Sequence, residues 1–407
     1  MRGAAPRLVL LAAAAVAYEL LRPGVWPWLL LLAVPAALAW LLYRRPPRLV
    51  LERELGHSRA FPGESLPVRL TVRLRAPLPL LLSIEESAPR TVIPDRPAAL
   101  SGLVWGERRL EFEYVVTPNS RGVYAWPPAR VSWSDPLGLF QHSARLGGDG
   151  GSELLVYPHS HGLVLPDLAT PVLAEGPTAR RRALEDPASV AGAREYVPGD
   201  PPRRIHWRQT AQHGVLPDGR FARLIVREFE SVAATGVVVH LDLDASGRGG
   251  ALYLESAARL AASVLREAHD SGLPVGASTA LTSSPMGGGF AAYERALAML
   301  ATVSLESGAG HDLPLPPPGT NLVVVTMRAP NALVDGALRA RARAARVTVV
   351  ALPEGFYLEP GEGPRPLFVA PPESVRELAA RAAVLEEAGV RVLVLRGDES
   401  VLRLAAR

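Results

Sequence analysis

Two carboxylates and a hydroxyl stand close together at Asp242, Asp244 and Ser246, directly after a long apolar run. Their oxygen atoms are of the kind that binds hard cations, so this cluster is where the chain could do chemistry. The two carboxylates could also serve an enzyme as acid and base, which would make the chain a hydrolase or another metal-dependent enzyme. Arg248 follows closely, and its guanidinium could neutralise both carboxylates without a metal. A working magnesium site and a remnant without metal both remain open.

The pattern around this cluster predicts the elements that hold it. Apolar strand patterns at 236–243, 274–281, 321–327, 347–352 and 390–395 alternate with helical patterns at 252–269, 291–303, 332–345 and 372–388. This alternation predicts a mainly parallel sheet covered by helices on both faces. Ligands of such sheets gather at the carboxyl ends of the strands, which is where Asp242 and Asp244 lie.

The preceding part of the chain has a different periodicity. In residues 67–75 and 109–116 apolar side chains alternate with mostly charged ones, which is typical of half-buried antiparallel strands. With turn residues between the strands, residues 46–160 are predicted to form a β-sandwich-like domain. Residues 161–190 are rich in Gly, Pro and charge, so they are predicted to be a linker.

Two apolar runs, 8–21 and 25–43, open the chain and are separated by Arg22, Pro23 and Gly24. They predict a transmembrane hairpin over residues 1–45, with a cleavable signal peptide as the competing interpretation. Arginines at both ends of the hairpin favour a cytoplasmic orientation, so the globular part is expected to face the cytoplasm from the inner membrane, with the lipid bilayer as a partner.

Composition excludes several classes of function. The 407 residues contain no cysteine and no lysine, which excludes disulfides, thiolate metal sites and the lysine of a phosphate-binding loop. The net charge of +4 is spread along the chain, so nucleic acid is not an expected partner. The motifs G-x-S-x-G and H-E-x-x-H do not occur, and we expect no catalytic residue and no enzyme.

A charged turn precedes the apolar strand at 236–243. Arginine, acidic and aromatic residues gather around a turn rich in Pro and Gly, and this collar is the predicted partner-binding surface: Arg194, Glu195, Tyr196, Gly199, Asp200, Arg203 and Trp207. Its charges could instead pair with one another as a structural clasp that closes the turn onto the sheet.

The collar also carries a family resemblance. R-E-Y-x-x-G-D-x-x-R-x-I-x-W at 194–207, followed by R-E-F-E at 227–230, closely resembles the bacterial family known as domain of unknown function 58. D-P-L-G-L-F at 135–140 resembles a second hallmark of that family. Its members are membrane-anchored proteins with a von Willebrand factor A-like domain, and they are associated with MoxR-type AAA+ ATPases. The chain departs from the family pattern at His206 and around 213–220.

The resemblance implies a fold class and a function. The expected fold is α/β and von Willebrand A-like, with a doubly wound, mainly parallel sheet over residues 191–407, preceded by the β-sandwich-like domain and the hairpin. Asp242-x-Asp244-x-Ser246 resembles the D-x-S-x-S start of a metal-ion-dependent adhesion site, with Asp244 in place of the first serine. The threonine expected near 287–290 is absent, and Met327 and Arg328 stand where an acid is expected. We therefore expect a membrane-anchored, non-enzymatic scaffold that binds a MoxR-type AAA+ ATPase.

Overall fold

The computed structural model divides the chain into two compact units, Met1–Pro158 and His159–Arg407. The residues that the structure describes are 13–14, 16–18, 34–35, 37–38, 40–43, 47–136, 141–147, 152–162, 184–197, 202, 205–212, 214, 223–232, 236–244, 250–306, 308–363 and 374–401.

The first unit consists of two β-sheets. The larger sheet is antiparallel and contains β1 (Arg48–Leu55), β3 (Leu66–Glu85), β4 (Val92–Pro94), β5 (Ala99–Pro118), β7 (Ala129–Ser134) and β8 (Gln141–Leu146). Its order is β4-β5-β3-β7-β8, and β1 pairs with the first half of β3. The smaller sheet contains β2 (Arg59–Ala60), β9 (Glu153–Val156) and β6 (Gly122–Ala125).

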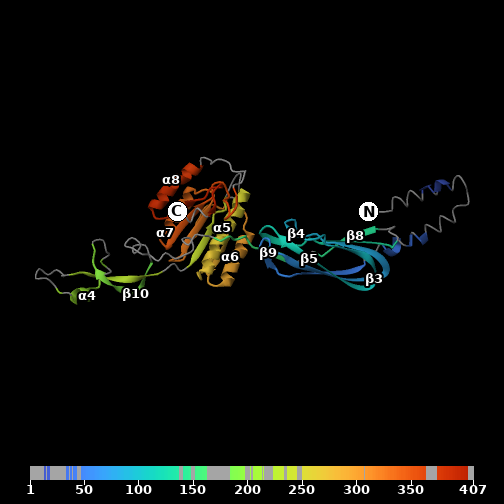
Figure 1. Cartoon of the computed structure of the whole chain (residues 1–407), viewed down its shortest axis with the longest axis horizontal. Helices are drawn as coiled ribbons and strands as arrows, with labels where there is room; N and C mark the ends of the chain where they lie inside the picture. Colours follow the sequence, from blue (N-terminus) through green and yellow to red (C-terminus); the bar gives the residue numbers. More distant parts are fainter. Residues whose placement is uncertain are drawn as a thin grey trace. The chain divides into compact units, whose positions relative to one another are not determined.

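The strands β3 and β5 dominate this unit. Each is 20 residues long, and the two run side by side as a curled antiparallel pair (Figure 1). Alternate side chains of β3 between Val68 and Ile84, apart from half-buried Leu78, are almost fully buried, because successive residues of a strand point to opposite faces of a sheet. They contribute to two apolar clusters, one around Leu80 and Trp133 and the other around Tyr114 and Trp126.

The second unit begins with a two-stranded antiparallel ribbon. It is formed by β10 (Leu184–Glu195) and β11 (Ile225–Val232). Between the two strands in sequence lies the short helix α4 (Trp207–Gln212), which contacts β11. The turn residues of the predicted collar that connect β10 to α4, Gly199 and Asp200 among them, lie outside the described residues.

The remainder of the second unit contains a six-stranded mixed sheet. Its strands are β12 (Val237–Leu241), β13 (Val275–Ser278), β14 (Ser283–Gly287), β15 (Asn321–Thr326), β16 (Arg346–Ala351) and β17 (Arg391–Val394), in the order β14-β13-β12-β15-β16-β17. The five strands other than β14 pair in parallel, and β14 returns antiparallel to β13 at the edge. Every residue of β12 and β15 is buried, as expected for strands covered on both faces.

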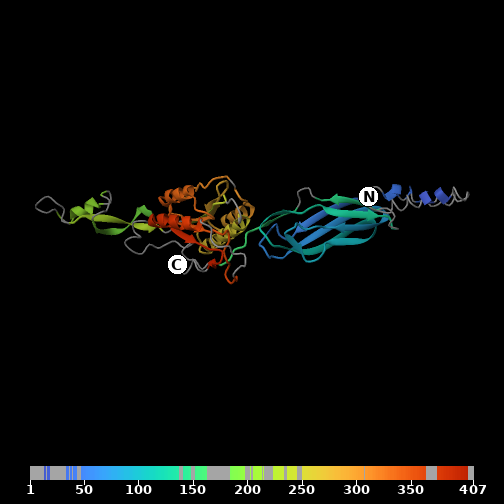
Figure 2. The ribbon, with the colours of Figure 1, turned by 90° about the horizontal axis from the view of Figure 1, so that it is seen from above.

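Four helices connect and cover these strands (Figures 1 and 2). They are α5 (Gly250–Asp270), α6 (Phe290–Thr302), α7 (Asn331–Arg341) and α8 (Ser374–Glu387). The helices α5 and α6 pack against each other and over β12 and β13, whereas α7 and α8 pack over β16 and β17. The alanine-rich faces of α5 and α7 allow this close approach, since Ala257, Ala261, Ala337 and Ala340 are fully buried.

The fold class predicted from the sequence is corrected by this architecture. The described chain is rich in antiparallel β-structure, with a curled antiparallel sheet in one unit and an antiparallel ribbon in the other. The alternation after residue 235 accounts for part of the second unit alone, and there β13 turns back into antiparallel β14. A doubly wound von Willebrand A-like fold behind a transmembrane hairpin is not shown.

The predicted membrane anchor is also corrected. No helix among the described residues is long and apolar enough to span a bilayer. Much of the two apolar runs at 8–21 and 25–43 lies outside those residues. The inner-membrane location predicted from them is therefore unsupported.

Candidate functional site

The carboxyl ends of three adjacent parallel strands bring polar side chains together in the second unit. Asp242 follows β12, Thr279 follows β13, and Thr326 ends β15. The register pairs Val237 of β12 with Val275 and Asn321, so the three strands end at nearly the same level. The sheet therefore collects these side chains at one edge, as parallel sheets do.

Asp242 is the most enclosed acid of this edge, with 5 % of its surface exposed. Its Oδ1 lies 2.8 Å from Nδ1 of His311, and its Oδ2 accepts a hydrogen bond of 2.7 Å from the Thr326 hydroxyl. Burial raises the pKa of Asp242, and the bonds from Thr326 and His311 oppose that shift. Both carboxylate oxygens are thus already bonded within the chain.

Asp244 and a loop before β15 complete the cluster. The Asp244 Oδ1 accepts a hydrogen bond of 3.3 Å from the backbone N–H of Gly308, and its Oδ2 lies 3.8 Å from Nε2 of His311. The backbone N–H of Glu306 donates to the carbonyl of Leu243 over 3.1 Å, which anchors the loop to the strand end. The His311 ring therefore stands between two carboxylates, one at each nitrogen.

Tyr253 on α5 is hydrogen-bonded to the end of β12. Its side chain is fully buried, and its hydroxyl lies 2.6 Å from the carbonyl of Asp242 and 3.0 Å from that of Val325. Burial raises the pKa of Tyr253 well above its usual value, so the group stays a neutral donor. This contact fixes the backbone from which the Asp242 carboxylate projects.

Glu306 forms a second acidic position at the same edge. Its Oε1 accepts a hydrogen bond of 2.6 Å from the Thr279 hydroxyl. Its Oε2 is buried and has no hydrogen-bond partner among the described residues. Thr279 in turn accepts the backbone N–H groups of Leu281 and Thr282, so its side chain also closes the turn between β13 and β14.

The described residues do not fit a magnesium ion at this edge. Both oxygens of Asp242 bond to His311 and Thr326, whereas a hard cation needs several oxygens directed at one point. No group of three or more His, Asp or Glu side chains among the described residues has the arrangement of a metal site. Ser246, the third residue of the predicted motif, and Arg248, which follows the motif, lie outside those residues.

Sequence reasoning missed His311, Glu306 and the role of Thr326 as a partner of Asp242. His311 is a lone histidine in a loop rich in Gly and Pro, and no spacing links it to Asp242, 69 residues earlier. Thr326 was predicted only as part of a strand. Its position at the carboxyl end of that strand was the one signal that could have pointed to this edge.

The collar residues fall into two groups. Arg194 and Glu195 end β10, Tyr196 follows them, and Trp207 begins α4. Gly199, Asp200 and Arg203 lie outside the described residues. Glu195 forms an ion pair of 3.0 Å with Arg223, and both side chains are about two-thirds exposed, at 63 % and 66 %. Sequence reasoning had not named Arg223 as a partner of Glu195.

The base of α4 is well anchored to β11. The His206 backbone N–H donates to the Ile225 carbonyl over 2.7 Å, and the Ile225 N–H donates to the hydroxyl of fully buried Thr210 over 3.0 Å. The indole of Trp207, on the same short helix, is 56 % exposed. A helix that is hydrogen-bonded to β11 thus carries a large exposed aromatic side chain.

Comparisons with known proteins do not assign the chain to a family. No family model matches it, and no curated protein matches it. Solved structures with local similarity include the PapD-like domain 7 of human CEP192, at 15 % identity and a TM-score of 0.18, covering 26 % of this chain and 83 % of that one. The CARDB domain of the PF1109 protein from Pyrococcus furiosus has 13 % identity and a TM-score of 0.17, covering 27 % and 93 %.

A β-glucosidase from Listeria innocua has 14 % identity and a TM-score of 0.15, and the match covers 25 % of this chain but only 16 % of the enzyme. These similarities are too weak to carry an argument about function.

Proposed function

We propose that this chain is a non-enzymatic scaffold that binds a protein partner through the collar on the β10–β11 ribbon. The observation that carries the proposal is the exposed indole of Trp207 on a helix that β11 holds in place. Tryptophan and arginine are the residues most often responsible for binding energy at protein interfaces. Val197, which is 57 % exposed, adds apolar surface beside the exposed end of β10.

The charges of the collar favour a contact surface over a structural clasp. Glu195 and Arg223 pair across the ribbon while both remain largely exposed. Exposed pairs of this kind contribute at most about 1 kcal/mol to stability, because water and salt screen them. Such charges are better suited to steering and orienting a partner than to closing the fold.

The partner class comes from the collar sequence. Its resemblance to domain of unknown function 58 implies a MoxR-type AAA+ ATPase, and we propose that class of protein as the partner. The collar offers one exposed aromatic side chain, Trp207, together with Arg194 and the Glu195–Arg223 pair, which carry charges of both signs. This composition is typical of the centre and rim of a protein interface.

Catalysis by Asp242 and Asp244 is the less favoured alternative. In a nucleophile–histidine–acid triad, the acid bonds one imidazole nitrogen and the nucleophile bonds the other. Here the second nitrogen of His311 faces the Asp244 carboxylate instead of a hydroxyl or thiol. The arrangement therefore supports an orienting and space-filling role for the histidine.

A binding measurement with the purified ATPase from the same genome tests the proposal. Trp207→Ala should weaken binding of the full chain by about ten-fold or more, since interface tryptophans commonly contribute 2 kcal/mol or more. Phe290→Ala is the matched control, because Phe290 on α6 is also an exposed aromatic, at 65 %. Both variants should keep the melting temperature of the unsubstituted chain. Equal affinity of all three proteins for the ATPase, or no binding by any of them, would overturn the proposal.

A further inference from the structure

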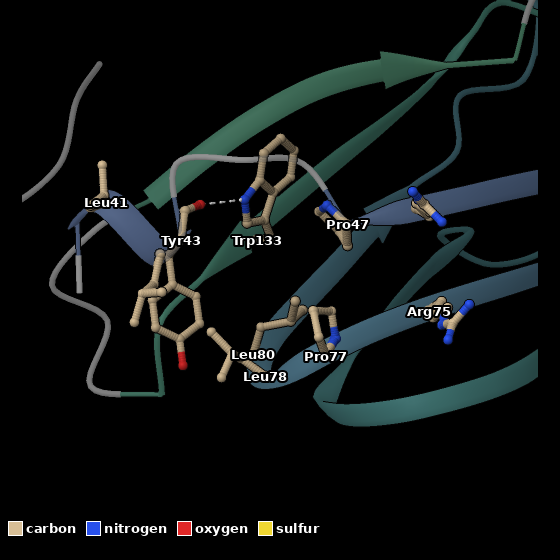
Figure 3. A pocket seen from close by; sticks show the side chains of 10 residues that line it. Leu41, Tyr43, Pro47, Arg75, Pro77, Leu78, Leu80 and Trp133 are labelled. Atoms are coloured by element: carbon tan, nitrogen blue, oxygen red, sulfur yellow. Dashed lines mark hydrogen bonds between the residues drawn. The ribbon is translucent and has the colours of Figure 1, made fainter. Parts of the chain in front are cut away.

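The first unit contains a cavity that the collar does not involve. Its volume is about 850 Å³, within the range of small-molecule sites. Eight of its ten lining residues have apolar or aromatic side chains. They include Leu41, Tyr43, Leu78, Leu80 and Trp133, as the close-up in Figure 3 shows. A hydrocarbon chain bound in the cavity would therefore bury apolar surface away from water.

A break in strand pairing opens this cavity. The ladder between β3 and β5 pairs Ala76 with Gly106 and resumes only at Leu80 with Val104. Pro77 and Pro79 lie in the gap, and proline has no N–H to donate to a neighbouring strand. The strand consequently bulges away from its partner, and the side chains of Pro77 and Leu78 line the opening.

The polar atoms of the wall are bonded to each other. The indole Nε1 of Trp133 donates to the carbonyl of Tyr43 over 3.0 Å, the contact drawn in Figure 3. The Tyr43 hydroxyl donates to the carbonyl of Pro79 over 2.8 Å, and burial raises the pKa of Tyr43. These two hydrogen bonds pair the indole N–H and the phenol O–H of the wall within the chain.

Two arginines supply the charge of the cavity. Arg48 and Arg75 both line it, and they lie directly opposite each other in the β1–β3 ladder. Like charges in that position repel each other. Arg75 pairs with exposed Glu107 over 3.3 Å, whereas no carboxylate among the described residues pairs with Arg48. None of the residues that line the cavity is acidic.

We propose that this cavity binds a single-chain amphiphile with a carboxylate head, that is, a long-chain carboxylate. The hydrocarbon chain packs against Leu78, Leu80 and Trp133, and the carboxylate lies between Arg48 and Arg75. One anion there relieves the repulsion of two cations and gains charge-assisted hydrogen bonds. An uncharged chain would lack this interaction, and a cationic amphiphile would be repelled.

Calorimetric titration of the delipidated full chain with hexadecanoate below its micelle concentration tests the proposal. We expect saturable one-to-one binding that weakens about ten-fold in Arg48→Gln, because bonds between charged groups are the strong ones. Hexadecanol lacks the carboxylate. Its affinity for the unsubstituted chain should therefore be no higher than the affinity of Arg48→Gln for hexadecanoate. Arg73→Gln is the matched control, since Arg73 is an exposed arginine of β3 that pairs with Glu52 outside the cavity. It should leave the affinity unchanged.

A second variant tests the apolar wall. Leu78→Gln changes a half-buried side chain at the opening and should weaken hexadecanoate binding by several-fold while the melting temperature shows that the unit remains folded. The proposal is wrong if hexadecanoate does not saturate, if Arg48→Gln and Arg73→Gln bind it equally well, or if anionic phospholipid vesicles bind in its place and compete it away.

Discussion

At the scale of single residues, the first unit contains a buried ion pair whose energetic role can be measured. The Glu86 side chain is fully buried, and its Oε1 bonds to Arg53, which is itself 7 % exposed. The Tyr114 hydroxyl donates to the same oxygen over 3.2 Å, and the Trp126 indole donates to that hydroxyl over 3.1 Å. The pair thus lies inside one of the two apolar clusters of the unit.

Removing Glu86 should destabilise the first unit strongly. Glu86→Ala leaves the Arg53 guanidinium in an apolar environment without its counter-charge, which typically costs about 3–5 kcal/mol. Glu113→Ala breaks the exposed Arg69–Glu113 pair and should cost far less stability, because water and salt screen that pair. Urea unfolding of both variants measures the difference. Equal losses would show that the buried pair contributes no more than a surface one.

His240 gives the second unit a pH dependence of known sign. The imidazole lies in β12, its Nδ1 is 3.1 Å from the Ser278 hydroxyl, and burial lowers its pKa to about 4. An unfolded histidine binds a proton near pH 6.5, so the unfolded chain takes up the proton first. The contribution to stability is complete above pH 6.5 and is lost as the pH falls from 6.5 to 4.

The size of this effect follows from the shift in pKa. The loss attributable to His240 should reach about 3 kcal/mol at the acidic end, since each pKa unit corresponds to about 1.4 kcal/mol. His240→Asn should remove that part of the pH dependence, and His57→Asn, at an exposed histidine of the first unit, should retain it. Chemical unfolding at pH 7, 6, 5 and 4 measures it. Parallel pH profiles for the unsubstituted chain and His240→Asn would contradict the assignment.

At the scale of secondary structure, the sequence predicted strand positions better than strand lengths. The strands predicted at 67–75 and 109–116 are segments of β3 and β5, each of which runs for 20 residues. Pro77 and Pro79 stand just after the first predicted strand, and proline has no N–H to donate to a ladder. The structure continues the strand through a bulge, and that bulge opens the cavity beside Arg75.

The candidate site was only partly predictable, because its residues come from segments that are far apart in the sequence. The position of Asp242 after an apolar strand indicated the right edge of the sheet. The partners of that carboxylate, His311 and Thr326, come from a loop and from a strand end far along the chain. Contacts of this kind depend on which strands become neighbours, and a local pattern does not contain that information. The edge strand β14 was not predicted, and it contains Pro285 and Gly287, which are residue types that disfavour strands.

At the scale of the whole molecule, the chain consists of two units with separate apolar cores. The clusters around Trp133 and Tyr114 belong to the first unit, and the cluster formed by β15, β16, α7 and α8 belongs to the second. A unit with a core of its own can unfold by itself. The two proposed binding sites, the cavity and the collar, are thus carried by different units.

Calorimetry of the full chain should therefore show two unfolding transitions that substitutions move separately. Glu86→Ala should lower the melting temperature of one transition only, because Arg53 and Glu86 lie within the first unit. Acidification from pH 6.5 to 4 should lower the melting temperature of the second unit's transition, because His240 lies in that unit. His240→Asn should reduce this change in melting temperature. Hexadecanoate should raise the transition that Glu86→Ala lowers, since a ligand stabilises only the unit that binds it. A single transition that responds to all three changes would show that the two cores unfold as one cooperative body.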